Sequence, residues 1–227
     1  MPLHALLRND ELTLAVSNIY NQRPFDTSGL GTSMNLQHQH DDCEFMAIAA
    51  TSFAEHGLRA VTIAQIADLT SRSESDIFAV YKNRLGLFVA VFDWYLSNVL
   101  TVRIGQLEAE FSPADAIVAL LEEAVGSRLS NAASTPYRLL EVALGISVRH
   151  DAIRDAVSAA LGETEAFFYR CILGAQHLGH FTDRRRPEDL ARFVLGMFVS
   201  TYALAHIHPG RNPVEGVIRP ILTMLRA

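Results

Sequence analysis

Hydroxyl and cationic side chains of the kind that contact nucleic acid gather between residues 62 and 84. Backbone N–H groups at a helix N-terminus bind phosphate, and Thr62 and Ser73 suit such starts, although simple helix capping explains both equally well. Lys82 and Arg84 carry charge that a phosphate backbone attracts. Arg72 has the guanidinium geometry that pairs with a guanine edge in the major groove. These residue types together predict a small DNA-contacting surface.

The sequence contains no pattern typical of an enzyme: it has no GxSxG, HExxH, P-loop or dinucleotide fingerprint. Among nine histidines, the pairs at positions 38 and 40, 177 and 180, and 206 and 208 have spacings that allow metal chelation. For each pair we favour the interpretation that the histidines are solvated or cap helices. Cys43 and Cys171 are far apart and in no CxxC pattern, which argues against a disulfide framework or structural zinc. We therefore expect no catalysis, metal or cofactor.

Three capping patterns mark the helices that must position the DNA-contacting residues. Asp41-x-x-Glu44, Thr62-x-x-Gln65 and Ser73-x-x-Asp76 each have the form of a capping box. They predict helices at about 45–56, 63–69 and 74–81, the first ended by Gly57 in a left-handed conformation. Asn83 then caps a fourth helix to about residue 102. Two short helices joined by a tight turn behind a longer one predict a helix-turn-helix.

The remainder of the chain also has helical patterning. Proline lies just inside four helix starts, as helices prefer, and these predict helices at 114–129, 137–150, 188–206 and 214–226, with a further one at 151–177. Strand signals are scarce. We predict an all-α fold with an N-terminal extension (1–41), a three-helix helix-turn-helix domain (42–90) and a C-terminal helical domain for ligand binding and dimerisation (91–227).

The segment between residues 49 and 87 resembles the signature of the tetracycline-repressor (TetR) family. That signature runs A-A-x-x-L-F-x-x-x-G, then T-x-x-x-I-A, then S-x-x-x-[LI]-Y-x-x-F-x-[SN]-K-x-x-L. The positions that carry the resemblance, with the spacing preserved, are Ala49, Ala50, Ser52, Phe53, Gly57, Thr62, Ile66, Ala67, Ser73, Ile77, Phe78, Tyr81, Asn83, Arg84 and Leu87. The resemblance continues more loosely through the helices that follow.

This resemblance implies a bacterial transcription regulator that binds a double-stranded DNA operator through its third helix. In such a repressor a small-molecule effector favours a subunit arrangement that no longer fits successive major grooves. The residues implied in DNA binding are Thr62, Ser71, Arg72, Ser73, Ser75, Phe78, Tyr81, Lys82 and Arg84.

The reading head departs from the family pattern in its turn and in its charge. The family's Ala-Gly-Val-Ser turn is Thr-Ser-Arg-Ser at 70–73, and without glycine it needs a costlier backbone or a different shape. Arg72 either removes an apolar core contact or points outward to DNA. Phe78 replaces a tyrosine, and Glu74 and Asp76 put negative charge on the reading helix. An alternative is a family-like protein with a degenerate head that acts as a small-molecule-binding or protein-interaction module.

The C-terminal body is expected to bind an effector and to form a homodimer. Stacked helices typically enclose an apolar pocket, and plain core packing is the simpler interpretation of each candidate side chain: Phe92, Tyr95, Phe111, Tyr137, Phe168 and Cys171. One apolar face of the helix after Pro187 is implied to pack on its copy in a second subunit, with burial in the chain's own core as the alternative for any one residue: Leu190, Val194, Met197, Phe198, Thr201 and Tyr202.

Charge and hydropathy set limits on the partners. A net charge of −6 over 227 residues argues against coating nucleic acid through overall charge, but it leaves room for a small reading module. Residues 43–93 hold four basic and six acidic side chains. The start lacks a signal-peptide pattern and no long apolar run occurs, so we expect a cytoplasmic protein with no membrane partner. Residues 1–41, with a flexible linker at 27–35, are either a dispensable tail or an arm that packs on a partner subunit.

Overall fold

The computed structural model describes residues 32–129, 135–207 and 218–226, with side chains at 41–124, 138–200 and 218–226. Within these ranges the chain is helical and contains no strand, so the all-α prediction is confirmed. The elements are α2 (Thr32–Ala60), α3 (Ile63–Thr70), α4 (Glu74–Tyr81), α5 (Arg84–Tyr95), the π-helical η2 (Leu96–Leu100), α6 (Thr101–Glu110), α7 (Pro113–Leu129), α8 (Thr135–Ser147), α9 (Asp151–His177), α10 (Pro187–Ile207) and α11 (Arg219–Arg226).

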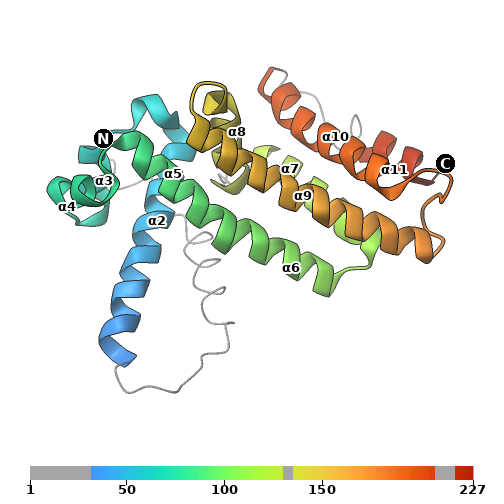
Figure 1. Cartoon of the computed structure of the whole chain (residues 1–227), viewed down its shortest axis with the longest axis horizontal. Coiled ribbons are helices and arrows are strands. Elements are labelled where there is room, and N and C mark those ends of the chain that lie inside the picture. Colours follow the sequence, from blue (N-terminus) through green and yellow to red (C-terminus); the bar gives the residue numbers. More distant parts are fainter. Residues whose placement is uncertain (1–31, 130–134, 208–217, 227) are drawn as a thin grey trace. The chain divides into compact units, whose positions relative to one another are not determined.

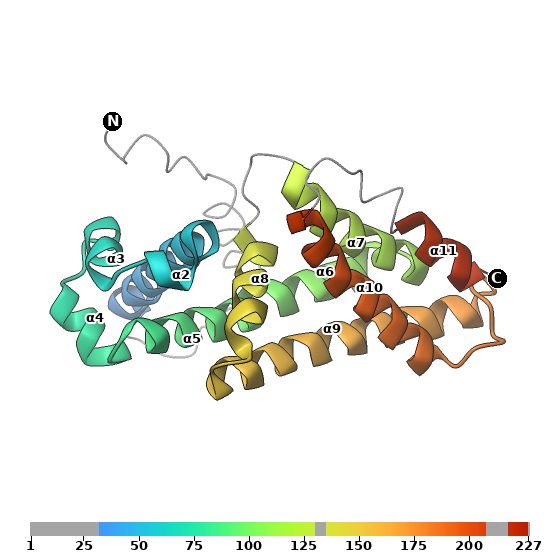
Figure 2. The same cartoon turned by 90° about the horizontal axis from the view of Figure 1, so that it is seen from above.

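The helices form two compact units. Unit 1 holds α2 to α5, η2 and α8, and unit 2 holds α6, α7, α10, α11 and α9 from Arg154 onward. In unit 1, α2 packs on α3, α5 and α8, and α3 lies beside α4 (Figure 1 and Figure 2). The division differs from the predicted boundary at residue 90, because Val91, Phe92 and Tyr95 are buried and α8 packs on α2 and α5.

Side-chain caps set the starts of α3, α4 and α5. Thr62 Oγ1 accepts the Gln65 N–H at 3.2 Å, and Gln65 Oε1 accepts the Thr62 N–H at 2.9 Å, which confirms this capping box. Ser73 and Asn83 likewise accept the backbone N–H three residues on, at 3.1 and 2.9 Å. Because each cap involves neighbours in sequence, the pattern alone predicted all three helix starts correctly.

The first described helix begins earlier than predicted. Asp41 lies inside α2, so the capping box predicted at Asp41 and Glu44 is wrong, and the linker predicted at 27–35 overlaps the start of this helix. Gly57 has φ 74° and ψ 166°, a combination that essentially only glycine adopts. It breaks α2 at the predicted position, although the ψ value is extended where a left-handed helical one was expected.

The helix after Asn83 continues beyond its predicted end near residue 102. It passes from α5 through η2 into α6, and Asn98 Nδ2 donates to the Trp94 carbonyl at 2.9 Å within the π-helical region. Within the described part of the chain, only the stretch Arg84–Glu110 is long and apolar enough to cross a membrane. Leu87 and Phe88 of this stretch have no exposed surface.

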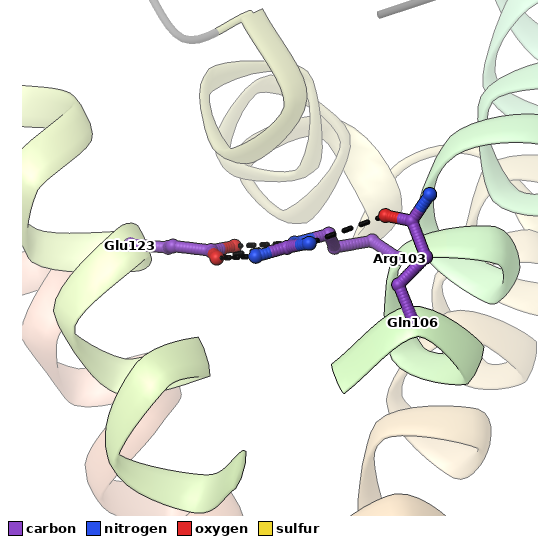
Figure 3. A network of polar contacts seen from close by, with 3 residues as sticks. All are labelled: Arg103, Gln106 and Glu123. Carbon is purple, nitrogen blue, oxygen red and sulfur yellow. Dashed lines mark hydrogen bonds and ion pairs between the residues drawn. The ribbon is translucent and has the colours of Figure 1, made fainter. Parts of the chain in front are cut away.

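Charged pairs connect the helices of unit 2. Arg103 on α6 places Nε 3.1 Å from both carboxylate oxygens of Glu123 on α7, and Nη1 donates to Gln106 Oε1 at 3.1 Å (Figure 3). The two charged side chains are each 34% exposed. Arg170 on α9 pairs with Glu108 on α6 at 2.7 Å. Such pairs fix helix register more than they add free energy, since water screens partly exposed charges.

Candidate nucleic-acid interface

The turn between α3 and α4 is built on a non-glycine residue in left-handed conformation. Ser71 has φ 54° and ψ 21°, and Thr70 Oγ1 donates to the Ile66 carbonyl at 2.7 Å, which closes the last turn of α3. A left-handed backbone costs a residue with a Cβ about 1–2 kcal/mol. The turn therefore keeps the tight shape and bears the steric cost that glycine would avoid.

We expect Ser71→Gly to raise the free energy of unfolding of unit 1 by about 0.5–1 kcal/mol, because the relieved strain exceeds the added chain entropy of glycine. The measurement is urea unfolding followed through Trp94, the one tryptophan of the chain. The control is Ser75→Gly on the helical backbone of α4, which should lower stability by about 1 kcal/mol. A destabilised Ser71→Gly variant would show that Ser71 is not held in a left-handed conformation.

α4 presents an exposed outer face above a buried contact. Ile77 is buried in unit 1. The opposite side of the helix carries Ser75 and Ala79, which are exposed. Phe78 and Val80 are 57% and 68% exposed. α4 therefore presents two large apolar side chains to solvent beside its small polar ones.

Arg72 packs back onto α2 instead of extending from the turn. Its guanidinium carbon lies 4.3 Å from the centre of the Phe45 ring, and Nη2 lies 2.5 Å from Asp42 Oδ1. The Phe45 ring also stacks on Tyr81, with centroids 5.8 Å apart. Burial raises the pKa of the Tyr81 phenol, Arg72 opposes this shift and Asp42 adds to it. Arg72 thus keeps a contact with the core and is paired within unit 1, which differs from both predicted alternatives.

The cations after α4 also have partners within unit 1. Arg84 Nη1 donates to the Arg59 and Val61 carbonyls at 2.9 and 3.2 Å, so Arg84 holds the segment that leads into α3. Lys82 has φ 68° and its Nζ donates to the Ala79 carbonyl at 2.5 Å, but its side chain is exposed. Lys82 can therefore reach a phosphate by exchanging one exposed hydrogen bond, whereas Arg84 has a structural role at this helix junction.

The structure brings the predicted DNA-contacting residues onto one region of unit 1, in two groups. Exposed members are Thr62, Ser71, Ser73, Ser75, Phe78 and Lys82, and partly buried members are Arg72, Tyr81 and Arg84. Sequence reasoning missed Asp42 and Phe45, which hold Arg72. The distance of 30 residues between Asp42 and Arg72 gives no local signal for that pair.

The residues predicted for the ligand pocket differ in how far they are buried. Phe92 of unit 1 and Phe168 of unit 2 have no exposed surface, so neither touches a space that water could enter. Phe111 is 43% exposed. Tyr95 and Cys171 are buried, and the side chain of Tyr137 lies outside the described residues. Burial alone does not decide whether these side chains line a ligand site, so the pocket stays a prediction.

Unit 2 instead has an open cleft beside the start of α10. Its volume is about 400 Å³, and it is lined by Arg184, Arg185, Arg186, Asp189, Leu190, Phe193 and Met224. Gln176 Nε2 donates to the Thr182 and Arg185 carbonyls at 2.7 and 3.0 Å and so holds the arginine segment in place. No residue predicted for the pocket lines this cleft. Among the described side chains no cluster of histidine, cysteine and acidic residues could hold a metal ion.

The predicted dimer face of α10 is largely the face that unit 2 uses itself. Leu190, Val194 and Phe198 are at most 2% exposed, so the chain's own helices cover these three side chains, which is the alternative that the sequence left open. The dimer contact of this helix stays a prediction. The periodicity identified an apolar face correctly but not what covers it. Met197 is half-buried, whereas the side chains of Thr201 and Tyr202 lie outside the described residues.

Cys171 is expected to resist alkylation in the folded protein. Burial, and then Glu108, raises the pKa of its thiol from 9.0 to about 12, and Arg170 opposes the shift. Since the thiolate is the reactive form, a shift of this size lowers its fraction at pH 8 by roughly 1000-fold. Iodoacetamide labelling of a Cys43→Ala variant, with and without urea, measures the effect. Labelling at similar rates in the two states would contradict it.

Comparisons with known proteins identify the fold. No family model and no curated protein sequence matches the chain. Several solved structures do match. The reduced form of NemR from E. coli matches with a TM-score of 0.71, 11% identity and coverage of 82% of this chain and 96% of that one. A TetR transcription regulator from Haloarcula marismortui matches with a TM-score of 0.68, 20% identity and coverage of 82% and 97%.

A third match is a protein from Saccharomonospora viridis described as a transcriptional regulator, in complex with choline. Its TM-score is 0.69 at 14% identity, with coverage of 82% of this chain and 94% of that one. The matched structures therefore include the body as well as the reading head. This chain has the fold of the TetR-family transcriptional regulators.

Proposed function

We propose that this chain is a TetR-type transcription regulator that binds a double-stranded DNA operator through α4. The observation that carries the proposal is the exposed outer face of α4, held by a capped, tight turn behind α3. In a helix-turn-helix the second helix enters the major groove, and its N-terminal residues meet the base edges. Thr62, Ser73 and Lys82 are exposed at the ends of α3 and α4, and we assign them to phosphate contacts.

The protein acts as a homodimeric repressor in the cytoplasm and is released by a small-molecule effector. Two reading heads are needed to span successive major grooves. The exposed side of α10, which carries Phe193, Gly196 and Ser200, is the surface that we assign to the partner subunit. An effector shifts the equilibrium only if it binds one subunit arrangement better than the other. Light scattering of the purified protein measures the oligomeric state, and a monomer at micromolar concentration would exclude this arrangement.

The test is fluorescence anisotropy with duplex DNA from the protein's own promoter region, against random DNA, over a range of salt concentrations. Of the cations between residues 43 and 93, Arg59 and Lys82 are exposed. Two heads with two phosphate contacts each give a slope of log K against log salt of roughly −4. Specific binding with this shallow slope supports the proposal. Binding no tighter than to random DNA, even at low salt, would refute it.

The acidic residues of α4 favour one other function. Glu74 and Asp76 are exposed on the helix that would meet DNA, and Arg72 is paired with Asp42. A helix-turn-helix with these charges also suits a protein that no longer binds DNA and instead binds a small molecule or another protein. The anisotropy assay separates the two functions, because only the regulator discriminates its operator from random duplex.

A further inference from the structure

The outer face of α4 has an unusual composition for a reading helix. Ile77 and Tyr81, four residues apart, define its inner side, because one is buried and the other half-buried. Helical geometry places Ala79 and Ser75 at the centre of the opposite side, with Asp76 and Phe78 on its two flanks. All four of these side chains are exposed.

The side chains that pair bidentately with purines are absent from this helix, and the Ser75 hydroxyl can pair with either kind of base. Guanine is read by Arg or Lys at O6 and N7, and adenine by Asn or Gln at N6 and N7. The sequence of α4, ESDIFAVY, contains none of these four residue types. Of the nearest cations, Arg72 is held by Asp42 and Phe45, and Lys82, which follows the helix, is assigned above to a phosphate.

The remaining groups match the major-groove edges of pyrimidines. A carboxylate accepts a hydrogen bond from the cytosine N4 amino group, and apolar side chains contact the thymine C5-methyl group. Asp76 also disfavours base pairs that present no hydrogen-bond donor to it. A carboxylate without a donor is unfavourable in the negative field of the DNA groove. Phe78 and Ala79 contribute most binding free energy where a thymine methyl group covers their exposed apolar surface.

We propose that α4 reads pyrimidines, with Asp76 accepting from a cytosine N4 amino group and Phe78 and Ala79 contacting thymine methyl groups. The inference rests on the proposed function, since it requires that α4 enters the major groove. It specifies bases of the operator: in each half-site, a cytosine and at least one adjacent thymine lie on the strand that faces α4.

The experiment begins with selection of bound duplexes from a randomised pool by the full-length protein. Thymines of the selected site are then replaced one at a time by deoxyuridine, which removes the C5-methyl group and keeps the pairing. A methyl group buried against Phe78 or Ala79 corresponds to about a four-fold loss of affinity per site. The Phe78→Ala variant should reduce this loss, whereas Val148→Ala, which truncates an exposed valine after α8, should leave it unchanged.

A second variant tests the cytosine contact. Asp76→Asn replaces an acceptor with an amide that pairs bidentately with adenine, so selection with this variant should exchange cytosine for adenine at one position of each half-site. An enriched site that tolerates every deoxyuridine and keeps its base preference with Asp76→Asn would overturn the pyrimidine reading while leaving the regulator function intact. Failure to enrich any sequence would instead overturn the proposed function itself.

Discussion

Replacing Phe53 with alanine should lower the free energy of unfolding of unit 1 by about 3–5 kcal/mol, the usual cost of truncating a buried phenylalanine. Phe53 has no exposed surface, and its ring meets Phe88 edge to face with centroids 5.2 Å apart. It joins α2 to α5, the two helices that support α3 and α4. The cavity left by alanine therefore weakens the support of α3 and α4.

The measurement is urea unfolding followed through Trp94 fluorescence, which reports on unit 1 because Trp94 lies in α5. Phe78→Ala is the matched control, since it removes the same ring from a position that is 57% exposed. That variant should change stability by no more than about 0.5 kcal/mol. Equal losses in the two variants would mean that the exposed ring of Phe78 is covered in the folded protein, or that Phe53 is not part of the core.

Local chemistry explains which helix boundaries the sequence could predict. Thr62, Ser73 and Asn83 cap helices through contacts three residues away, so short patterns suffice to locate them. Asp41 has the same pattern with Glu44 yet lies within α2. A capping residue is decisive only where the chain before it leaves the helix, and a short pattern does not contain that information.

Contacts between distant segments explain what the sequence could not predict about the site. The departure at Arg72 was visible, but its partners Asp42 and Phe45 lie about 30 residues earlier and follow from how α2 packs. The sequence also could not predict what covers the apolar face of α10, which includes Leu190, Val194 and Phe198. An apolar helical face has the same periodicity whether its own unit or a second subunit covers it. Exposure, which needs the fold, separates those cases.

The largest functional effect is expected from Ala79→Glu, which should weaken operator binding on the order of 100-fold or more. Ala79 is exposed at the centre of the outer face of α4. A glutamate there adds a negative charge and a longer side chain where the proposal places base edges, and each lost base contact costs about 1–3 kcal/mol in each of two heads. Anisotropy with the selected operator measures the loss.

Ala109→Glu is the matched control, because it makes the same change at an exposed position of α6 in unit 2. It adds the same overall charge on a helix for which no base contact is proposed, so it should change operator affinity by less than about three-fold. Both variants should unfold near the wild-type urea concentration, because neither alanine is buried. If Ala79→Glu binds the operator as tightly as Ala109→Glu does, α4 does not enter the major groove, and the exposed Phe78 and Val80 must then serve a protein partner.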